Sequence, residues 1–361
     1  MFERSETHLA IRGSFRLGGL GAVRLAALLA TMVLSCGGSV QQTSTGVGGA
    51  TSSSSRASST ASASSASSMS SASSASTGAG GGGSGGGACA GLTLGPGDHV
   101  DTLPEGSAMR TFRVHVPKSY APPSRASVVL VFHGLNEDAG GIEQQAVMDP
   151  VSDVHGFLAV YPQGLDNSWN AGGCCGTSSM GMVDDLTFVR DLLAKLETEY
   201  CVDPKRVFAA GFSNGGMLSH RLACEMSDRI AAIGAVSGTL AIDGCAPPRA
   251  VAVMAVHGTG DFVVGYADGG FSGAKGVPPT IAAWTKIDGC TDAMPTSVLK
   301  HGDASCDEYQ ACTAGVAVRL CTIDQGGHQW PGGQNDFLGK LSVDLDASSE
   351  IAKFFEAHPM P

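Results

Sequence analysis

The stretch that decides the fold is Arg206-Val207-Phe208-Ala209-Ala210-Gly211-Phe212-Ser213-Asn214-Gly215-Gly216-Met217. Its apolar first part predicts a buried strand, and a helix-like pattern follows over residues 216–226. Between them lies the motif Gly-x-Ser-x-Gly. This motif indicates a catalytic serine when it forms a sharp turn between a strand and a helix. Such a turn raises the serine hydroxyl above the sheet, so we predict Ser213 as a nucleophile.

This pattern needs its context, because glycine supplies 51 of the 361 residues and accidental matches are expected. A second match, Gly82-Gly83-Ser84-Gly85-Gly86, lies in a glycine tract without strand or helix signals beside it. We therefore exclude Ser84. The alternative for Ser213 is an ordinary turn serine that caps the following helix.

Outward from this stretch, apolar strand-like runs alternate with helical patterns. Strands are predicted over residues 109–116, 127–132, 157–161, 230–236, 250–256 and 316–323, and helices over 141–154, 185–200 and 347–357. We interpret Asp184 and Asp185 as caps of the second helix. The alternation predicts an α/β fold, a doubly wound and mainly parallel sheet with helices on both faces, whose site lies at the carboxyl ends of the strands.

Two further residues at strand ends complete a candidate catalytic set. A serine hydroxyl needs a base to take its proton and a carboxylate to orient that base. Asp261 follows the strand over 250–256, and His328 follows the strand that ends near residue 323. The order Ser213, Asp261, His328 is that of the α/β-hydrolase triad. The backbone N–H groups of Asn214 and Leu135 are predicted to form the oxyanion hole.

Each of these partners has rivals in the sequence. Other candidate carboxylates are Asp268, Asp288, Asp303 and Asp324. His133 and His257 also end strands, and we expect them to brace loops.

The N-terminal part of the chain predicts export. Arg12, Arg16 and Arg24 precede an apolar run over residues 25–34 that is too short to span a bilayer. The run ends in Val33-Leu34-Ser35-Cys36, which resembles a bacterial lipoprotein cleavage box, so Cys36 is the predicted lipidation site and the only membrane contact. A plain secretory signal is the alternative. We expect residues 1–36 as the signal, 37–87 as a disordered Ser/Ala/Gly-rich tether and 88–361 as the catalytic domain.

Charge and cysteine content narrow the function further. The net charge of −11 argues against a nucleic-acid partner, which needs a basic face. Apart from Cys36, the 11 cysteines leave an even number, which behind an export signal indicates disulfides and an extracellular or outer-surface location. We predict the pairs Cys290–Cys312 and Cys306–Cys321. Without a C-x-x-C pair, a zinc site is not expected, and no metal or cofactor is predicted.

Several motifs together resemble a known family. They are Phe132-His133-Gly134, Tyr161-Pro162-Gln163-Gly164, Trp169-Asn170 with Cys174-Cys175, Asp184-Asp185, Gly211 to Met217, His257-Gly258-Thr259-Gly260-Asp261 and Gly326 to Gly332. From residue 89 onward the chain is similar to the secreted polyhydroxybutyrate depolymerases and feruloyl esterases, carbohydrate-esterase family one of the α/β-hydrolase superfamily. The resemblance implies the same triad without a metal or organic cofactor. Cys321, where an aromatic residue is expected, and the extra Cys306 depart from the pattern and imply an additional disulfide.

We therefore expect a serine carboxylesterase that acts through an acyl-enzyme on a polymeric ester. A feruloyl or acetyl ester of plant cell-wall xylan is the favoured substrate, and a polyhydroxybutyrate depolymerase is the first alternative. An acyltransferase on the same fold and a non-catalytic anchored binding protein are the others, and a peptidase ranks below them. Trp169, Trp330 and His133 are candidate substrate contacts, with core packing the alternative for Trp330.

Overall fold

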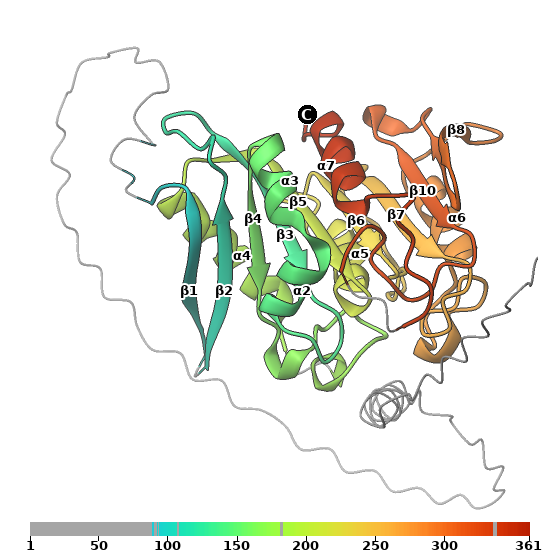
Figure 1. Cartoon of the computed structure of the whole chain (residues 1–361), viewed down its shortest axis with the longest axis horizontal. Coiled ribbons are helices and arrows are strands. Elements are labelled where there is room, and N and C mark those ends of the chain that lie inside the picture. The colour runs from blue at the N-terminus through green and yellow to red at the C-terminus, as the bar shows by residue number, and fades with distance from the viewer. Residues whose placement is uncertain (1–88, 90–91, 93, 107, 181–182, 335–337) are drawn as a thin grey trace, which may run out of the picture. The chain divides into compact units, whose positions relative to one another are not determined.

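The computed structural model describes residues 89, 92, 94–106, 108–180, 183–334 and 338–361. They belong to one compact unit in which ten strands form a single mixed sheet (Figure 1). The expected export signal and tether, including Cys36, lie outside the described residues. None of the helices in the described part combines the length and the apolar character needed to cross a membrane.

The sheet has a parallel centre and antiparallel edges, in the order β1-β2-β4-β3-β5-β6-β7-β10-β9-β8. Pairing is parallel from β4 through to β10. These central strands are β4 (Phe157–Pro162), β3 (Ala126–Phe132), β5 (Val202–Phe212), β6 (Ala232–Val236), β7 (Ala252–Gly258) and β10 (Val318–Ile323). The edge strands are β1 (Gly97–Glu105), β2 (Ala108–Val116), β8 (Thr296–His301) and β9 (Ala304–Tyr309).

Helices cover both faces of the sheet because its central strands are apolar on both sides. Along β3, Val128 and Leu130 pack into one core and Val129 and Val131 into the other. The first core includes α4 (Asp185–Glu199), α5 (Asn214–Glu225) and α6 (Val277–Ile287). The second includes α2 (Ala139–Ala146), α3 (Met148–His155) and α7 (Ala347–Ala357) (Figure 1). The predicted doubly wound architecture is confirmed.

The structure also corrects several predicted elements. The single helix expected over 141–154 is two helices, because the backbone turns left-handed at Val147, with a φ of 53°. The strands β1, β8 and β9 and the helix α6 were not predicted. The residues of β8 are mostly exposed, and those of β1 alternate between exposed and half-buried, so neither strand carries a strong apolar run.

Five disulfides join the ten cysteines among the described residues. They are Cys89–Cys201, Cys174–Cys175, Cys224–Cys245, Cys290–Cys312 and Cys306–Cys321. Both predicted pairs are confirmed, and the last one joins the neighbouring strands β9 and β10.

Candidate active site

Ser213 lies in a tight turn between β5 and α5, at the carboxyl end of a central strand. Its backbone is strained, with φ 53° and ψ −118°, and its N–H donates to Val236 O on the neighbouring strand at 2.9 Å. The turn needs glycine at position 215, because a Cβ there would lie 2.2 Å from Phe132 O. A Cβ at Gly211 would lie 2.4 Å from the backbone of Gly215. The Gly-x-Ser-x-Gly pattern thus reflects close backbone packing.

The structure brings Asp261 and His328 together as expected. Asp261 follows β7, His328 follows β10, and His328 Nδ1 lies 2.8 Å from Asp261 Oδ2. The other carboxylate oxygen accepts hydrogen bonds from Val263 N and Val264 N, both at 2.9 Å. Of the rival carboxylates, Asp303 pairs with Lys340 and Asp288 accepts from the backbone.

Electrostatics keep the Asp261 carboxylate charged. Burial alone would raise its pKa, but the charge of His328 and hydrogen bonds from His257 and His328 hold the pKa below its usual value. A charged acceptor fixes the proton of a neutral His328 on Nδ1 and leaves Nε2 with a lone pair. Nε2 is buried and has no hydrogen-bond partner among the described residues. A histidine held in this way can accept a proton at Nε2.

Ser213 and His328 line the same cavity, which has a volume of about 430 Å³. Phe212, the loop over residues 134–138 and the side chains of Gln144 and Gln334 form much of the rest of its wall. Hydrogen bonds between catalytic residues are often long before substrate binds. The observation that matters here is therefore that Ser213 and His328 line the same cavity.

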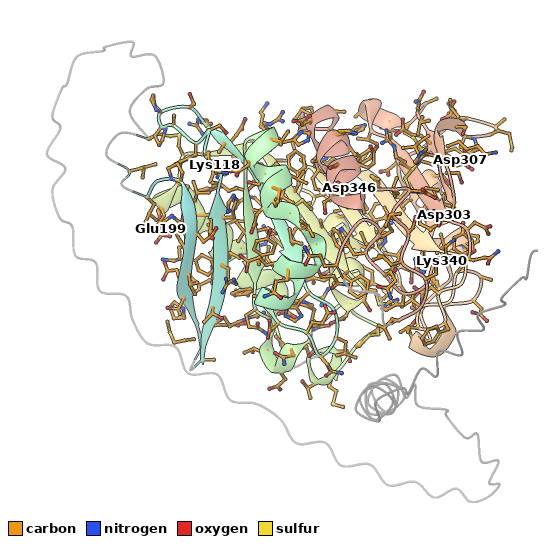
Figure 2. The ribbon with its side chains drawn as sticks, viewed as in Figure 1. Lys118, Glu199, Asp303, Asp307, Lys340 and Asp346 are labelled. Carbon is orange, nitrogen blue, oxygen red and sulfur yellow. A yellow bond between two sulfur atoms is a disulfide. The ribbon has the colours of Figure 1, made fainter. Side chains whose placement is uncertain are left out.

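The His328 loop is held in place by the chain that follows it. His328 N donates to Leu338 O and Gly327 N donates to Lys340 O, each at 2.9 Å. Lys340 in turn pairs with Asp303 at 2.8 Å, which ties the segment to the β9 edge of the sheet (Figure 2). His328 is therefore held both by the strand β10 that precedes it and by backbone hydrogen bonds to Leu338 and Lys340.

The loop after β3 places Leu135 at the cavity. His133 Nδ1 donates to Gly134 O at 2.7 Å, while His133 Nε2 accepts from Gly164 N at 2.9 Å. Burial lowers the pKa of His133 to about 4, so this histidine is neutral at neutral pH. Within the described residues, neither Leu135 N nor Asn214 N donates a hydrogen bond, which fits the predicted oxyanion hole.

The side chain of Asn214 anchors the long loop between β4 and α4. Its Oδ1 accepts from Trp169 N at 2.7 Å, and its Nδ2 donates to Trp169 O at 3.1 Å and to Cys174 O at 3.3 Å. The residue after Ser213 is thus fixed by three hydrogen bonds.

The three predicted substrate contacts are wrong. Trp169 is 0% exposed and Trp330 is 1% exposed, so neither indole ring is available to stack on a ligand. Trp169 Nε1 donates to His133 O and Trp330 Nε1 donates to Ser348 Oγ, each at 3.0 Å, so their polar ends are satisfied inside the core. His133 is also buried and braces two loops, the alternative that we had expected for it.

Asp184 and Asp185 were both predicted to cap the helix α4, and only Asp184 does so. Asp184 caps α4 by accepting from Thr187 N at 3.1 Å. Asp185 is buried and pairs with Arg110 Nη1 at 2.8 Å, while its other oxygen accepts from Asn170 N at 2.7 Å. It therefore holds the Trp169 loop against β2, a role that the sequence did not indicate.

Sequence reasoning also missed Glu137, whose side chain lines the cavity beside His328. The available signal was a run of three polar residues, 136–138, in the loop predicted to supply an oxyanion donor.

One group in the described residues has metal-ligand geometry. Asp98, His115 and Asp149 bring potential ligand atoms within 4.8 Å of one another, and none of the three is among the residues that line the cavity. Hydrogen bonds already engage each of them: His115 with Asp98 at 2.6 Å, and Tyr161 to Asp149 at 2.5 Å. These hydrogen bonds explain why the three side chains lie close together without a metal ion.

Comparison with known proteins agrees with this geometry. Residues 178–273 match a family model described as Phospholipase/Carboxylesterase. The chain is 30% identical over 248 residues to feruloyl esterase B of Piromyces equi, covering 64% of this chain and 45% of that protein. It is 28% identical over 267 residues to feruloyl esterase D of Neurospora crassa, covering 69% of this chain and 85% of that protein.

A solved structure shows the same fold. The acetyl xylan esterase from Aspergillus awamori superposes with a TM-score of 0.51 at 13% identity, over 72% of this chain and 99% of that one. The chain spans less than half the length of feruloyl esterase B and 23% of the length of a bifunctional acetylxylan esterase/xylanase of Neocallimastix patriciarum. The chain therefore has the α/β-hydrolase fold, and its sequence is similar to those of feruloyl esterases.

Proposed function

We propose that the protein is a serine carboxylesterase that acts through an acyl-enzyme, with Ser213 as nucleophile, His328 as base and Asp261 as the acid that orients it. One observation carries the proposal: the imidazole of His328, which Asp261 orients and whose Nε2 has no hydrogen-bond partner among the described residues, shares a cavity with a serine on a strained strand-to-helix turn. This combination is the arrangement that nucleophilic acyl transfer requires.

The mechanism follows from these positions. His328 Nε2 takes the proton of Ser213 as the hydroxyl attacks the ester carbonyl, and Asp261 stabilises the imidazolium that forms. The amides of Asn214 and Leu135 donate to the oxyanion of the tetrahedral intermediate. His328 then protonates the leaving alcohol, and water attacks the acyl-enzyme to release the acid and free Ser213.

For the substrate we propose a feruloyl or acetyl ester of a plant cell-wall polysaccharide. The names of the related feruloyl and acetylxylan esterases support this class. The cavity wall agrees with it, because Gln144 and Gln334 carry side-chain amides, which can donate to and accept from sugar hydroxyls. Export, with lipidation at Cys36, would bring the enzyme to such an extracellular polymer, and the five disulfides suit that location.

A substrate panel tests this function. The purified full-length protein and its Ser213→Ala variant are incubated with feruloylated xylan, acetylated xylan and polyhydroxybutyrate, and the released ferulate, acetate and 3-hydroxybutyrate are quantified. We expect release of ferulate or acetate by the wild type and none by the variant. Release of 3-hydroxybutyrate alone would contradict the substrate, and equal release by both proteins would contradict the nucleophile.

A further inference from the structure

Glu137 lies in the cavity wall together with Ser213 and His328. Its carboxylate Oε2 accepts from Gly134 N at 2.8 Å, and its own N–H donates to Gly134 O at 3.3 Å. Glu137 thus binds both backbone polar groups of Gly134, one through its side chain and one through its own N–H, and these two bonds close the turn over residues 134–137. Leu135, whose amide is a proposed oxyanion donor, lies inside this turn.

The carboxylate is packed closely against the backbone that it holds. A Cβ at Gly134 would lie 3.0 Å from Glu137 Oε2 and 3.1 Å from the ring of Phe212. On the far side of the turn, Asn136 adopts a left-handed φ of 62° and donates from its N–H to Asn167 O at 2.8 Å. Without the carboxylate, Gly134 N would lose its acceptor and the turn would lose one of its closing bonds.

Glu137 also interacts with the catalytic base through its charge. Burial raises the pKa of Glu137, and the Gly134 N–H and the charge of His328 oppose that rise. Since electrostatic interactions are mutual, a charged Glu137 stabilises a protonated His328. In the part of the chain that the structure describes, the other charged groups that interact with this pair are Asp138, which is next to Glu137 in the chain, and Asp261, which binds His328 Nδ1.

We propose that Glu137 is a positioning residue of the active site: its carboxylate holds the turn that aims the Leu135 amide at the oxyanion, and its charge stabilises the imidazolium of His328. This inference rests on the proposed esterase function. Glu137 itself exchanges no proton with the substrate and forms no bond to it. It acts through the loop and through the base.

Two substitutions separate these contributions. Glu137→Gln keeps a side-chain oxygen that can accept from Gly134 N but removes the charge, and Glu137→Ala removes both. Glu143→Gln is the matched control, since Glu143 lies on α2, pairs with Arg113 and is not part of the cavity wall. For each full-length variant, kcat and KM for 4-nitrophenyl acetate are measured across pH, with Ser213→Ala in parallel.

We expect Glu137→Ala to lower kcat by about 10- to 100-fold with KM changed less than about threefold, since the weakened donor acts in the transition state. We expect Glu137→Gln to keep kcat within about threefold at its optimum. The acidic limb of its kcat/KM profile should move to lower pH, because the imidazolium would lose a stabilising charge. Glu143→Gln should leave both kcat and the acidic limb of the kcat/KM profile unchanged.

The outcomes distinguish this inference from the proposed function. Wild-type kcat in Glu137→Ala and an unmoved acidic limb in Glu137→Gln, with Ser213→Ala inactive, would overturn the role of Glu137 and leave the esterase intact. Turnover by Ser213→Ala would overturn the function itself. Should Glu137→Ala fail to fold, the pH profile of Glu137→Gln decides, and a limb that coincides with the wild type's contradicts the inference.

Discussion

Replacing Gly215 by alanine tests whether the nucleophile turn and the oxyanion loop are held in direct backbone contact. The new Cβ would lie 2.2 Å from Phe132 O and 2.6 Å from His133 O, whereas ordinary contact begins at 3.4 Å. Relief of the closer overlap needs 3.4 − 2.2 = 1.2 Å of movement between β3 and the start of α5. Both obstructing atoms belong to the backbone, so no side-chain rotation can supply that movement.

This displacement has a cost in stability and a larger cost in rate. Overpacking typically lowers the free energy of unfolding by about 1–3 kcal/mol, and this outweighs the gain of about 1 kcal/mol from alanine's helix propensity. A misplacement of about 1 Å between reacting groups can lower turnover by about 100-fold. We therefore expect Gly215→Ala to fold, with modestly reduced stability and kcat reduced by roughly two orders of magnitude.

The assay combines hydrolysis of 4-nitrophenyl acetate with urea unfolding. Gly95→Ala is the control, because a Cβ at Gly95 meets none of the described residues within 4 Å, and it should change neither kcat nor the free energy of unfolding. Gly215→Ala with kcat within about threefold of the wild type would refute the claim that this contact positions the catalytic groups.

Three further predictions concern the acid, a buried carboxyl and a disulfide. Asp261→Asn should lower kcat by about 10⁴-fold, because an amide no longer fixes the productive tautomer of His328, and near-wild-type hydrolysis would contradict this role. Burial raises the pKa of Asp288 from 3.8 to about 7, so the folded protein binds a proton that the unfolded chain releases. Urea unfolding should therefore show that the wild type loses stability relative to Asp288→Asn as pH rises from about 4 to 7, and parallel curves would contradict it. Replacing Cys306 and Cys321 by alanine opens a link with a sequence separation of 15 and should lower the free energy of unfolding by roughly 3 kcal/mol, and unchanged urea midpoints would count against this.

The positions of the three residues of the proposed triad could be predicted because each residue follows a recognisable element. Ser213 is preceded by the apolar end of β5, and Asp261 and His328 come a few residues after β7 and β10. The carboxyl ends of parallel strands meet at one edge, so chain order and strand ends were enough to bring Asp261 and His328 together.

The surroundings of the triad could not be predicted in the same way. The contacts that bury Trp169 come from His133 O and from the side chain of Asn214, 36 and 45 residues away in the chain. The pairing of Arg110 with Asp185 spans 75 residues and has no local pattern. Whether an indole ring lies in a cavity wall or in the core depends on these long-range contacts. The hydrophobic periodicity of the sequence contains no information about them.

The central claim is that Ser213 is a nucleophile activated by its surroundings. Reaction of the full-length protein with a fluorophosphonate, followed by mass spectrometry of its peptides, tests this most directly. We predict one phosphonyl group per chain, on Ser213, that appears in step with the loss of esterase activity and is absent from the Ser213→Ala and His328→Ala variants. An unmodified Ser213 in protein that hydrolyses esters, or equal labelling of the Ser213→Ala variant, would contradict the account.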